Sequence, residues 1–394
     1  SYDNRYNLQA NFRADAFDSS KLSLQNRWGY FPSFSAGWTL SNEPFFKDNV
    51  DRNIVNQIKL RASWGRNGNI SVLYNYPYAT TISLNSQKYQ YSTTDPSYST
   101  GSKPSGLANP GLTWETSEQI DLGLDARSFN NRLTFAMDYY MKKTKDLLVS
   151  VKPAAEVGIG STTINAGNVD NSGLELELGW RDQIGDFSYS VNANMATLKN
   201  KVTYLDPTVG RISGATFSNS EFITCFEAGY PVWYMRGYIY DGVNSATGEP
   251  ILRDLDDNNV IDSNDMTMVG SGIPDVTYGI TINLGYKNFD FTLFGTGAAG
   301  NDIYSCVYRT EHVRINSLKY FFENRWTPEN TGASMPSISN IATNIKFWSS
   351  TANLFDGSYF KIKQIQLGYT LPESLLSKVH VSSLRVFASL DDFF

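Results

Sequence analysis

An acidic stretch, DLDDNNVIDSND, carries oxygen-bearing residues at the spacing of a calcium-binding loop. Hard cations prefer such oxygen ligands when they converge from one tight turn. Asn259 stands where that pattern usually has glycine, but asparagine tolerates the left-handed backbone required there. Asp265 stands where the pattern has a bidentate glutamate, and this shorter carboxylate weakens the match. The candidate ligands of a structural Ca²⁺ are Asp254, Asp256, Asn258, Val260 (through its backbone carbonyl), Asp262 and Asp265. A solvated acidic turn is the alternative.

A second candidate is a cluster of aromatic residues that follows the EAGYP segment in the longest predicted loop. Aromatic rings stack on sugars or pack against peptides, but they also anchor loops. Both roles remain open at this stage. The candidate substrate-binding residues are Trp233, Tyr234, Tyr238 and Tyr240.

Catalytic groups are harder to find. Glu175 and Glu177 lie two residues apart and could form a carboxylate pair for glycoside hydrolysis. Lys59, Arg61 and Asp121 occupy similar polar positions on other predicted strands, which favours a charged sheet face instead. The sequence has no nucleophile elbow, phosphate-binding loop or metal-hydrolase motif. We therefore do not expect an enzyme.

Amino-acid composition further narrows the classes of protein to which this chain could belong. The net charge of −6 and the lack of clustered Lys and Arg argue against nucleic-acid binding. With only two histidines, a zinc site or a histidine-based triad is not expected. Cys225 and Cys306 could be bridged in an oxidising compartment or remain unpaired. No run of about 18 apolar residues indicates a membrane-spanning helix.

Period-two alternation is the main structural signal. In VTYGITINLGY the bulky apolar residues alternate with small or polar ones, which puts all of them on one face of a strand. About eleven such strands are expected: Tyr6–Ala16, Phe34–Leu40, Ile58–Trp64, Ile120–Ala126, Leu133–Tyr139, Leu174–Trp180, Phe187–Met195, Val276–Tyr286, Phe289–Leu293, Ile365–Leu371 and Leu384–Leu390.

The connections between these strands are alternately short and long, as in an outer-membrane barrel with short periplasmic turns and long extracellular loops. The long ones are expected at 66–112, 145–169, 200–274 and 300–356. An odd number of strands does not close a single-chain bacterial barrel, and a half-barrel would expose two unpaired edges to lipid. We therefore expect the chain to be a fragment of a longer protein.

Several stretches, in order along nearly the whole chain, resemble the C-terminal part of SusC/RagA-type TonB-linked outer-membrane proteins, the nutrient importers of Bacteroidetes. Examples are NRWGYFPSFSAGWTLSNEPFF, NPGLTWETSEQIDLGLDARSFNNRLTFAMDYYMKKTKDLL, EAGYPVWYMRGYIYDG and SYFKIKQIQLGYTLPESLL. In the family, the acidic segment usually reads Asp-Gly where this chain has Asn258-Asn259.

The resemblance implies an all-β fold, a transmembrane antiparallel up-and-down β-barrel of about 22 strands. Residues 1–394 would be its C-terminal half. The plug domain, the TonB box and the final strands would lie outside this chain. It also implies TonB-dependent import of a glycan or a peptide, glycan being favoured. Expected partners are a SusD-like surface lipoprotein lid, the TonB-ExbB-ExbD complex and outer-membrane lipid, in a dimer of SusC-SusD pairs. A surface adhesin that binds glycans or proteins without transport is the alternative.

Overall fold

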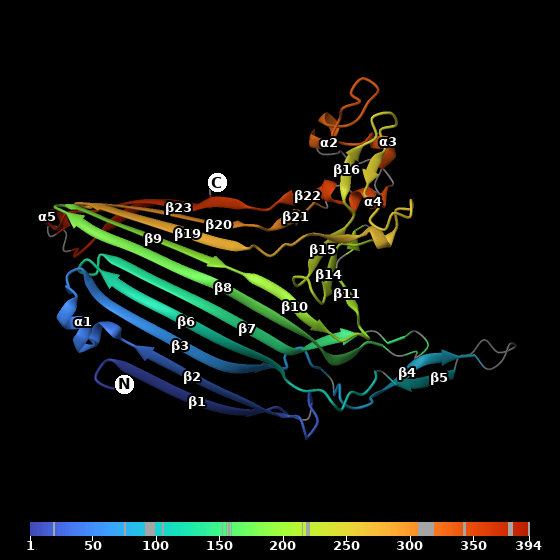
Figure 1. The fold of residues 1–394 in the computed structure, drawn as a ribbon, viewed down its shortest axis with the longest axis horizontal. Coiled ribbons are helices and arrows are strands. Elements are labelled where there is room, and N and C mark those ends of the chain that lie inside the picture. The colour runs from blue at the N-terminus through green and yellow to red at the C-terminus, as the bar shows by residue number, and fades with distance from the viewer. Residues whose placement is uncertain are drawn as a thin grey trace.

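The structure is a computed structural model. It describes residues 1–394 except 19, 75, 91–98, 105, 152, 155, 157, 159, 215, 218–220, 306–318, 342–343, 377–380 and 393–394. One long, curved antiparallel sheet dominates the described chain (Figure 1). None of the described helices is long and apolar enough to cross a membrane.

The sheet follows the chain in order, with the path β1-β2-β3-β6-β7-β8-β9-β19-β20-β23-β24, and β10 pairs with β8 beyond the end of β9. The strands are β1 (Tyr6–Ala16), β2 (Trp28–Trp38), β3 (Val55–Asn69), β6 (Glu115–Ser128), β7 (Leu133–Val151), β8 (Thr162–Ile184), β9 (Phe187–Thr197), β10 (Lys199–Leu205), β19 (Val276–Tyr286), β20 (Phe289–Ala299), β23 (Tyr359–Thr370) and β24 (Arg385–Asp391). The eleven predicted strands are the eleven on this path, so the predicted all-β fold is confirmed.

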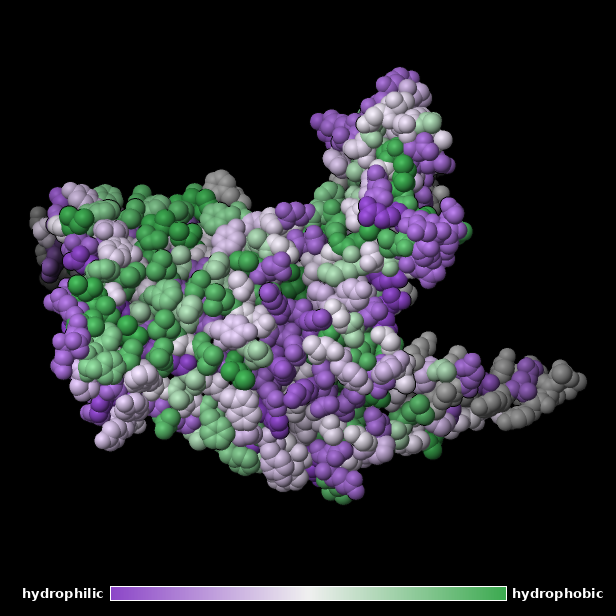
Figure 2. All heavy atoms as spheres, viewed as in Figure 1, coloured by the Kyte–Doolittle hydropathy of each residue, from purple (hydrophilic) through white to green (hydrophobic). Residues whose placement is uncertain are grey.

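Each strand divides its side chains between two faces. The outer face carries the large apolar residues of the alternation, many of them exposed, such as Leu8, Phe34 and Leu122. The inner face carries the polar partners, such as Arg61 and Asp121. In the view of Figure 2, hydrophobic residues gather over the long strands and hydrophilic ones toward the end with the long loops. A sheet with one apolar and one polar face is what a barrel wall between lipid and an aqueous lumen requires.

The turns at one end of the sheet are short. Positive φ angles at Asn130 and Asn131 shape the β6–β7 turn, and Lys287 and Gly185 do the same in the β19–β20 and β8–β9 turns. Asparagine and glycine adopt this left-handed conformation at low cost, which favours tight hairpins. The β2–β3 connection holds η1 (Leu40–Asn42) and α1 (Pro44–Asn49), and the β23–β24 connection holds α5 (Glu373–Leu376).

One predicted loop is shorter than expected. The segment 145–169 was expected as a long connection, but β7 continues to Val151 and β8 starts at Thr162. Two bulges near Thr144 and Leu147 let the pairing continue past the point where the alternation breaks. Between β3 and β6, the hairpin β4 (Ile82–Tyr89) and β5 (Ser99–Pro104) projects from the sheet (Figure 1).

The two longest loops fold into a module at the loop end of the sheet. The β9–β19 loop contributes β11 (Arg211–Ser213), β12 (Thr216–Phe217), β13 (Glu221–Phe222), β14 (Thr224–Glu227), β15 (Tyr234–Gly237), β16 (Tyr240–Val243), β17 (Pro250–Leu252), η3 (Ser263–Asp265) and β18 (Thr267–Gly270). The β20–β23 loop contributes β21 (Asp302–Tyr304), α2 (Lys319–Glu323), α3 (Ile338–Ile341), α4 (Ile345–Trp348), η4 (Thr351–Asn353) and β22 (Leu354–Asp356).

Candidate functional site

The inner face carries a network of ion pairs across β3, β6 and β7. The Arg61 guanidinium donates to both carboxylate oxygens of Asp125, at 2.8 and 2.9 Å, and to Asp138 at 2.9 Å. Ser63 donates to Asp121 at 3.0 Å. These groups are partly exposed on the inner face. They form a charged patch on the inner face of the sheet.

Glycines on the inner face let side chains reach across a whole strand. Gly123 lies between Arg61 and Asp138, and a Cβ built there would approach both side chains to within 2.7 Å. Gly368 lies in the same way between Arg385 and Asp290. The missing side chain is therefore what opens the path for these cross-strand pairs.

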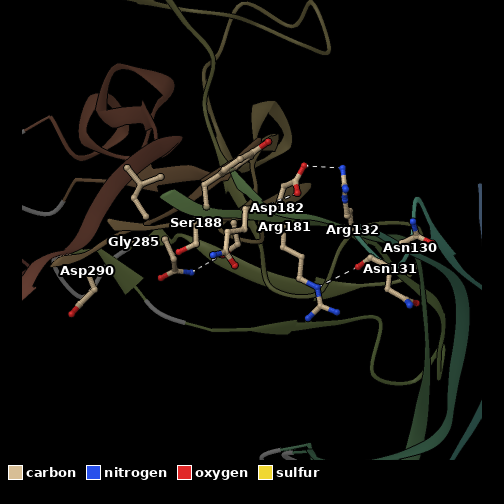
Figure 3. A pocket seen from close by; sticks show the side chains of 13 residues that line it. Asn130, Asn131, Arg132, Arg181, Asp182, Ser188, Gly285 and Asp290 are labelled. Carbon is tan, nitrogen blue, oxygen red and sulfur yellow. Dashed lines mark hydrogen bonds and ion pairs between the residues drawn. The ribbon is translucent and has the colours of Figure 1, made fainter. Parts of the chain in front are cut away.

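A polar hollow of about 540 Å³ lies on the inner face near the short turns (Figure 3). Arg132 donates to Asp182 at 3.0 Å, and Arg181 donates to the Asn131 carbonyl at 3.2 Å. Both arginines of the lining are thus already paired. The hollow lies at the turn end of the wall, away from the module.

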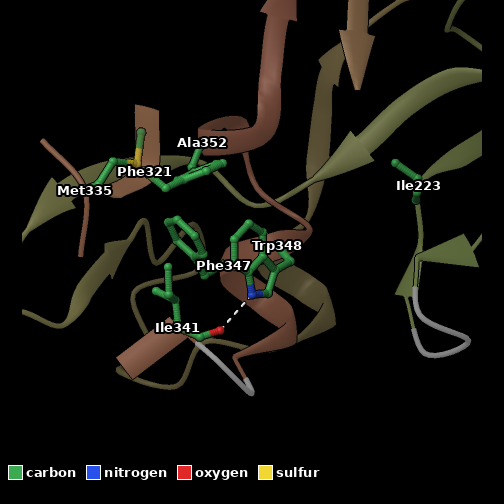
Figure 4. Close-up of a cluster of buried hydrophobic side chains, with 7 residues drawn as sticks. All are labelled: Ile223, Phe321, Met335, Ile341, Phe347, Trp348 and Ala352. Atoms are coloured by element: carbon green, nitrogen blue, oxygen red, sulfur yellow. Dashed lines mark hydrogen bonds between the residues drawn. The ribbon is translucent and has the colours of Figure 1, made fainter. Parts of the chain in front are cut away.

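The module has its own hydrophobic core, drawn in Figure 4. Phe347 and Trp348 are fully buried there, and the Trp348 indole N–H donates to the Ile341 carbonyl at 2.7 Å. The core also includes Ile223 from the other loop. Burying large aromatic side chains supplies most of the free energy that holds such a small unit together.

Backbone contacts join the two loops at Tyr238. Its N–H donates to the Ser349 carbonyl, and its carbonyl accepts from the Thr351 N–H, both at 3.0 Å. A Cβ at Gly237 would lie 2.4 Å from the Ser349 carbonyl oxygen, so glycine permits this close approach. The two loops therefore behave as one structural unit.

The acidic loop gathers three of the four predicted carboxylates. Ligand oxygens of Asp254, Asp256 and Asp265 lie within 4.8 Å of one another. Asn259 has φ 65°, so the left-handed conformation expected at this position is confirmed. Asp262 instead accepts from the Asn264 N–H at 2.7 Å and caps η3.

Hydrogen bonds within the loop also hold its carboxylates. Asp265 is fully buried and accepts from the N–H groups of Leu255 and Asp262, at 2.7 and 2.8 Å. These backbone donors hold the pKa of Asp265 below its usual range. Asn258 accepts from the Val260 N–H at 2.7 Å, and the Val260 side chain is exposed. The three carboxylates are thus held close together by the fold of the loop.

The aromatic candidates occupy different environments. Tyr234 and Tyr238 are buried, and the Tyr234 hydroxyl donates to Glu227 at 2.8 Å. Burial and this bond raise the pKa of Tyr234. Tyr240 packs edge-on against Phe347. Its hydroxyl donates to the Ser334 carbonyl at 2.8 Å, and burial raises the pKa of Tyr240 to about 12. These three rings anchor the module.

Trp233 differs from its neighbours. Its side chain is 45% exposed, and its backbone has φ 54°, an uncommon conformation for a large residue. Its ring packs at a tilt against Phe226. Of the four predicted substrate contacts, Trp233 alone is exposed.

The remaining candidates give little chemistry. Glu175 and Glu177 lie on the inner face of β8, opposite Asp138 and Ala136 of β7, as expected for a charged wall. Cys225 is buried and has a free thiol, and burial raises its pKa. Cys306, the other half of the predicted pair, lies outside the described residues.

Sequence reasoning missed the residues that join the two loops, such as Gly237, Ser349 and Thr351. These contacts link positions more than 100 residues apart, and no local pattern marks them. Sequence reasoning also ended two strands too early. The alternation continues along β3 to Arg66 and along β7 to Lys143, which the period of two would have shown.

Comparison with known proteins agrees with this architecture. Residues 1–296 match the family model described as TonB dependent receptor-like, beta-barrel. TonB-dependent receptor P3 of Formosa agariphila is 32% identical over 96% of this chain and 38% of that protein. TonB-dependent receptor SusC of Bacteroides thetaiotaomicron is 29% identical over 93% of this chain and 36% of that protein. The chain thus spans about two fifths of the length of these relatives, both of which are named TonB-dependent receptors.

A solved structure of the RagAB peptide transporter superposes with a TM-score of 0.82 at 24% identity, over 100% of this chain and 42% of that one. This likeness concerns the fold. The family model covers most of the chain, and the predicted resemblance to SusC and RagA is confirmed. The chain therefore belongs to the TonB dependent receptor-like β-barrel family, whose members are outer-membrane transport proteins of Gram-negative bacteria.

Proposed function

We propose that this chain is a C-terminal part of the barrel wall of a TonB-dependent importer that takes up a nutrient oligomer across the outer membrane. The observation that carries the proposal is the division of the sheet into an apolar outer and a charged inner face, with both long loops joined at one end. A wall of this kind separates lipid from an aqueous path. The energy for import comes from TonB-ExbB-ExbD, acting on a plug that lies outside this chain.

The module is proposed to meet a SusD-like surface lipoprotein that closes the mouth of the barrel. It stands at the loop end of the sheet, where the extracellular side of such barrels lies (Figure 1). Its core keeps its two loops in one shape, which a docking lid needs. The resemblance to SusC/RagA-type proteins implies this partner, and the RagAB peptide transporter shares the fold.

For the cargo we propose an oligosaccharide, with a peptide as the second candidate. An exposed indole is a suitable platform for a sugar ring, and Trp233 offers one on the module. The peptide alternative is motivated by the RagAB peptide transporter, which shares the fold. A TonB-dependent path through a charged lumen suits either class.

We also propose a structural Ca²⁺ in the acidic loop. Asp254, Asp256 and Asp265 offer converging oxygens, and Asn259 supplies the left-handed turn. Lys346 of the other long loop donates to the carbonyl of Ile261, so the acidic loop is tied to both halves of the module. A bound cation would stiffen this junction.

Co-purification tests the proposal. The full-length protein is extracted from native membranes in mild detergent, and its companions are identified by mass spectrometry. A stoichiometric surface lipoprotein, together with uptake of labelled oligosaccharide that stops when the proton-motive force is collapsed, is the expected result. Cell-surface binding of the oligosaccharide that persists without uptake, and no lipoprotein, would favour the adhesin alternative.

A further inference from the structure

A second hollow, of about 490 Å³, adjoins the one in Figure 3 on the inner face, and the two share Arg181 and Ser190. Its floor follows one row of register partners across four strands, from β6 to β9. This row is Arg127, Thr134, Gly179 and Asn192. Arg181 and Ser190 are partners in the next inner row toward the short turns. No carboxylate lies among the described residues that line this hollow, which we call the arginine hollow.

The two arginines on its inner side lack the carboxylate partners that other inner-face arginines have. Arg61, for example, donates two hydrogen bonds to Asp125. Arg127 is exposed, and its guanidinium has no hydrogen-bond or ion-pair partner in the described part of the chain. Arg181 donates only from its Nε, to a carbonyl of the β6–β7 turn. Both of its Nη groups are therefore available to a ligand.

Gly179 leaves space at the floor between two polar side chains. A Cβ built there would contact the Thr134 hydroxyl and lie 2.8 Å from the Asn192 amide oxygen. The Ser190 hydroxyl accepts from Asn283 at 3.3 Å and keeps its own hydrogen for another partner. The arginine hollow thus presents hydroxyl and amide groups beside two open guanidinium groups.

This combination fits a sugar that carries a carboxylate. One strand separates β6 from β8, so the backbones of Arg127 and Arg181 lie about 10 Å apart across the sheet, and both side chains line the same hollow. A guanidinium matches the two oxygens of a carboxylate with paired hydrogen bonds. The neutral groups of Thr134, Ser190 and Asn192 suit the hydroxyls of a sugar ring. A carboxylate on a protein side chain would bring no such hydroxyls.

We propose that the arginine hollow binds a carboxylate of the imported oligomer, which makes an oligosaccharide with uronic acid residues the substrate class. The site rests on the proposed function, because only a lumen that carries cargo brings such a ligand to the inner face. The carboxylate lies between Arg127 and Arg181, and the ring hydroxyls face Ser190 and Asn192. The competing occupant is a side-chain carboxylate of the plug.

The test uses the full-length protein in detergent and phenylglyoxal, a reagent that modifies guanidinium groups. Peptide mapping by mass spectrometry follows the rate of modification at each arginine. The probes are trigalacturonate and its methyl ester, which is the same sugar without the charges. Arg127 and Arg181 should react faster than Arg61, which two carboxylates hold. Trigalacturonate should slow the reaction of both, and the ester should not.

Variants assign the protection to this site. Arg127→Gln is followed at the remaining Arg181, and Arg181→Gln at Arg127. Each should raise the half-protecting concentration of trigalacturonate on the order of 10-fold, as expected for one charge-assisted hydrogen bond. Gly179→Val, which fills the floor, should raise it at both arginines. Arg13→Gln is the matched control and should behave as the wild type, because Arg13 is already paired with Asp15. The heat-dependent shift on electrophoresis checks the folding of every variant.

Equal protection by the acid and the ester would overturn the proposal, and so would an equal loss of protection in Arg13→Gln. Slow modification of Arg127 and Arg181 without any probe, at the rate of Arg61, would identify the plug carboxylate as the occupant instead. Tighter protection by triglutamate than by trigalacturonate would assign the hollow to a peptide. The labelling needs no proton-motive force, so a failure here is separate from a failure of uptake or co-purification, which test the importer itself.

Discussion

Arg61 on β3 reaches Asp138 on β7 at 2.9 Å across the intervening strand β6, because Gly123 has no side chain to block the path. The same guanidinium holds Asp125 with two hydrogen bonds. Three neighbouring strands are therefore joined by one side chain on the lumen side, in addition to their backbone ladders.

Gly123→Val should break this arrangement. The new side chain displaces Arg61 from Asp138, and we expect a loss of about 1 kcal/mol in unfolding free energy, since partly exposed ion pairs contribute little each. Gly332→Val is the control, because a Cβ at Gly332 meets no atom within 4 Å. Urea unfolding in lipid vesicles measures both. If Asp138→Asn adds its full cost on top of Gly123→Val, the two residues are not coupled and the interpretation fails.

Trp348→Ala should loosen the module without unfolding the sheet. Removing a buried indole costs about 3–5 kcal/mol, which a small unit does not tolerate. Limited proteolysis should then cut within 300–358 at far lower protease concentration than in the wild type. The heat-dependent electrophoretic shift of the barrel should stay unchanged. Trp233→Ala, at an exposed ring, serves as control, and equal protease resistance in the two variants would contradict the assignment of the core.

Acid should weaken the module through Asp265. Its folded pKa lies below its unfolded value, so it contributes stability above the ordinary aspartate range of about 4 and loses this contribution as pH falls through the folded pKa. Asp265→Asn should therefore be less protease-resistant than the wild type at pH 7, and the difference should shrink in acid.

Asp256 should act in the opposite direction. Loss of hydration and the carboxylates of Asp265 and Asp254 raise its pKa, so its ionised form opposes folding above that pKa. Asp256→Asn should raise the stability of the cation-free module at pH 7. For Asp265, by contrast, an advantage of the wild type over Asp265→Asn that grows as the pH falls would show that the direction assigned to its pKa shift is wrong.

Calcium should protect the same module. Isothermal titration of chelator-treated protein with CaCl₂ should give one site, lost in Asp254→Asn/Asp256→Asn, and added CaCl₂ should slow proteolysis of the wild type. Asp241→Asn provides the control, because Asp241 pairs with Arg253 and lies outside the acidic group. No heat of binding at millimolar CaCl₂ would leave the loop as a hydrogen-bonded acidic turn.

Trp233 should matter for uptake and not for folding. Stacking of a ring on a ligand contributes about 0.5–1.5 kcal/mol, so Trp233→Ala should raise the apparent KM for labelled oligosaccharide about 2- to 12-fold. Tyr234→Phe keeps a buried ring and loses only the bond to Glu227, so its uptake should match the wild type. Unchanged uptake in Trp233→Ala would remove the last aromatic support for a glycan cargo.

The sheet could be predicted because its signal is local and repeats. A strand such as Val276–Tyr286 must place one face in lipid and the other in water, so a period of two is imposed on every strand. Strand ends were less predictable, since β7 continues through bulges and charged residues where the apolar pattern stops. Tight turns with Asn130-Asn131 and Lys287 were visible from residue type and spacing.

The module could not be predicted, because its contacts join distant positions. Tyr234 and Tyr238 look like ligand-binding residues in sequence, and only the packing of two loops shows that they are buried. The acidic loop was found because its ligand spacing lies within one turn. Asn259 illustrates this, since its left-handed backbone follows from residue type and position in the loop alone.

The docking of the two long loops through Gly237, Tyr238 and Ser349 also limits how this surface is engineered or inherited. A chimaera that exchanges 198–275 without 300–358 would place a foreign strand against the Ser349 carbonyl and expose half a core. Both loops must be transplanted as a pair for a hybrid receptor to assemble. Recombination between related genes should therefore keep the two segments together, although they are separated along the chain by the hairpin of β19 and β20.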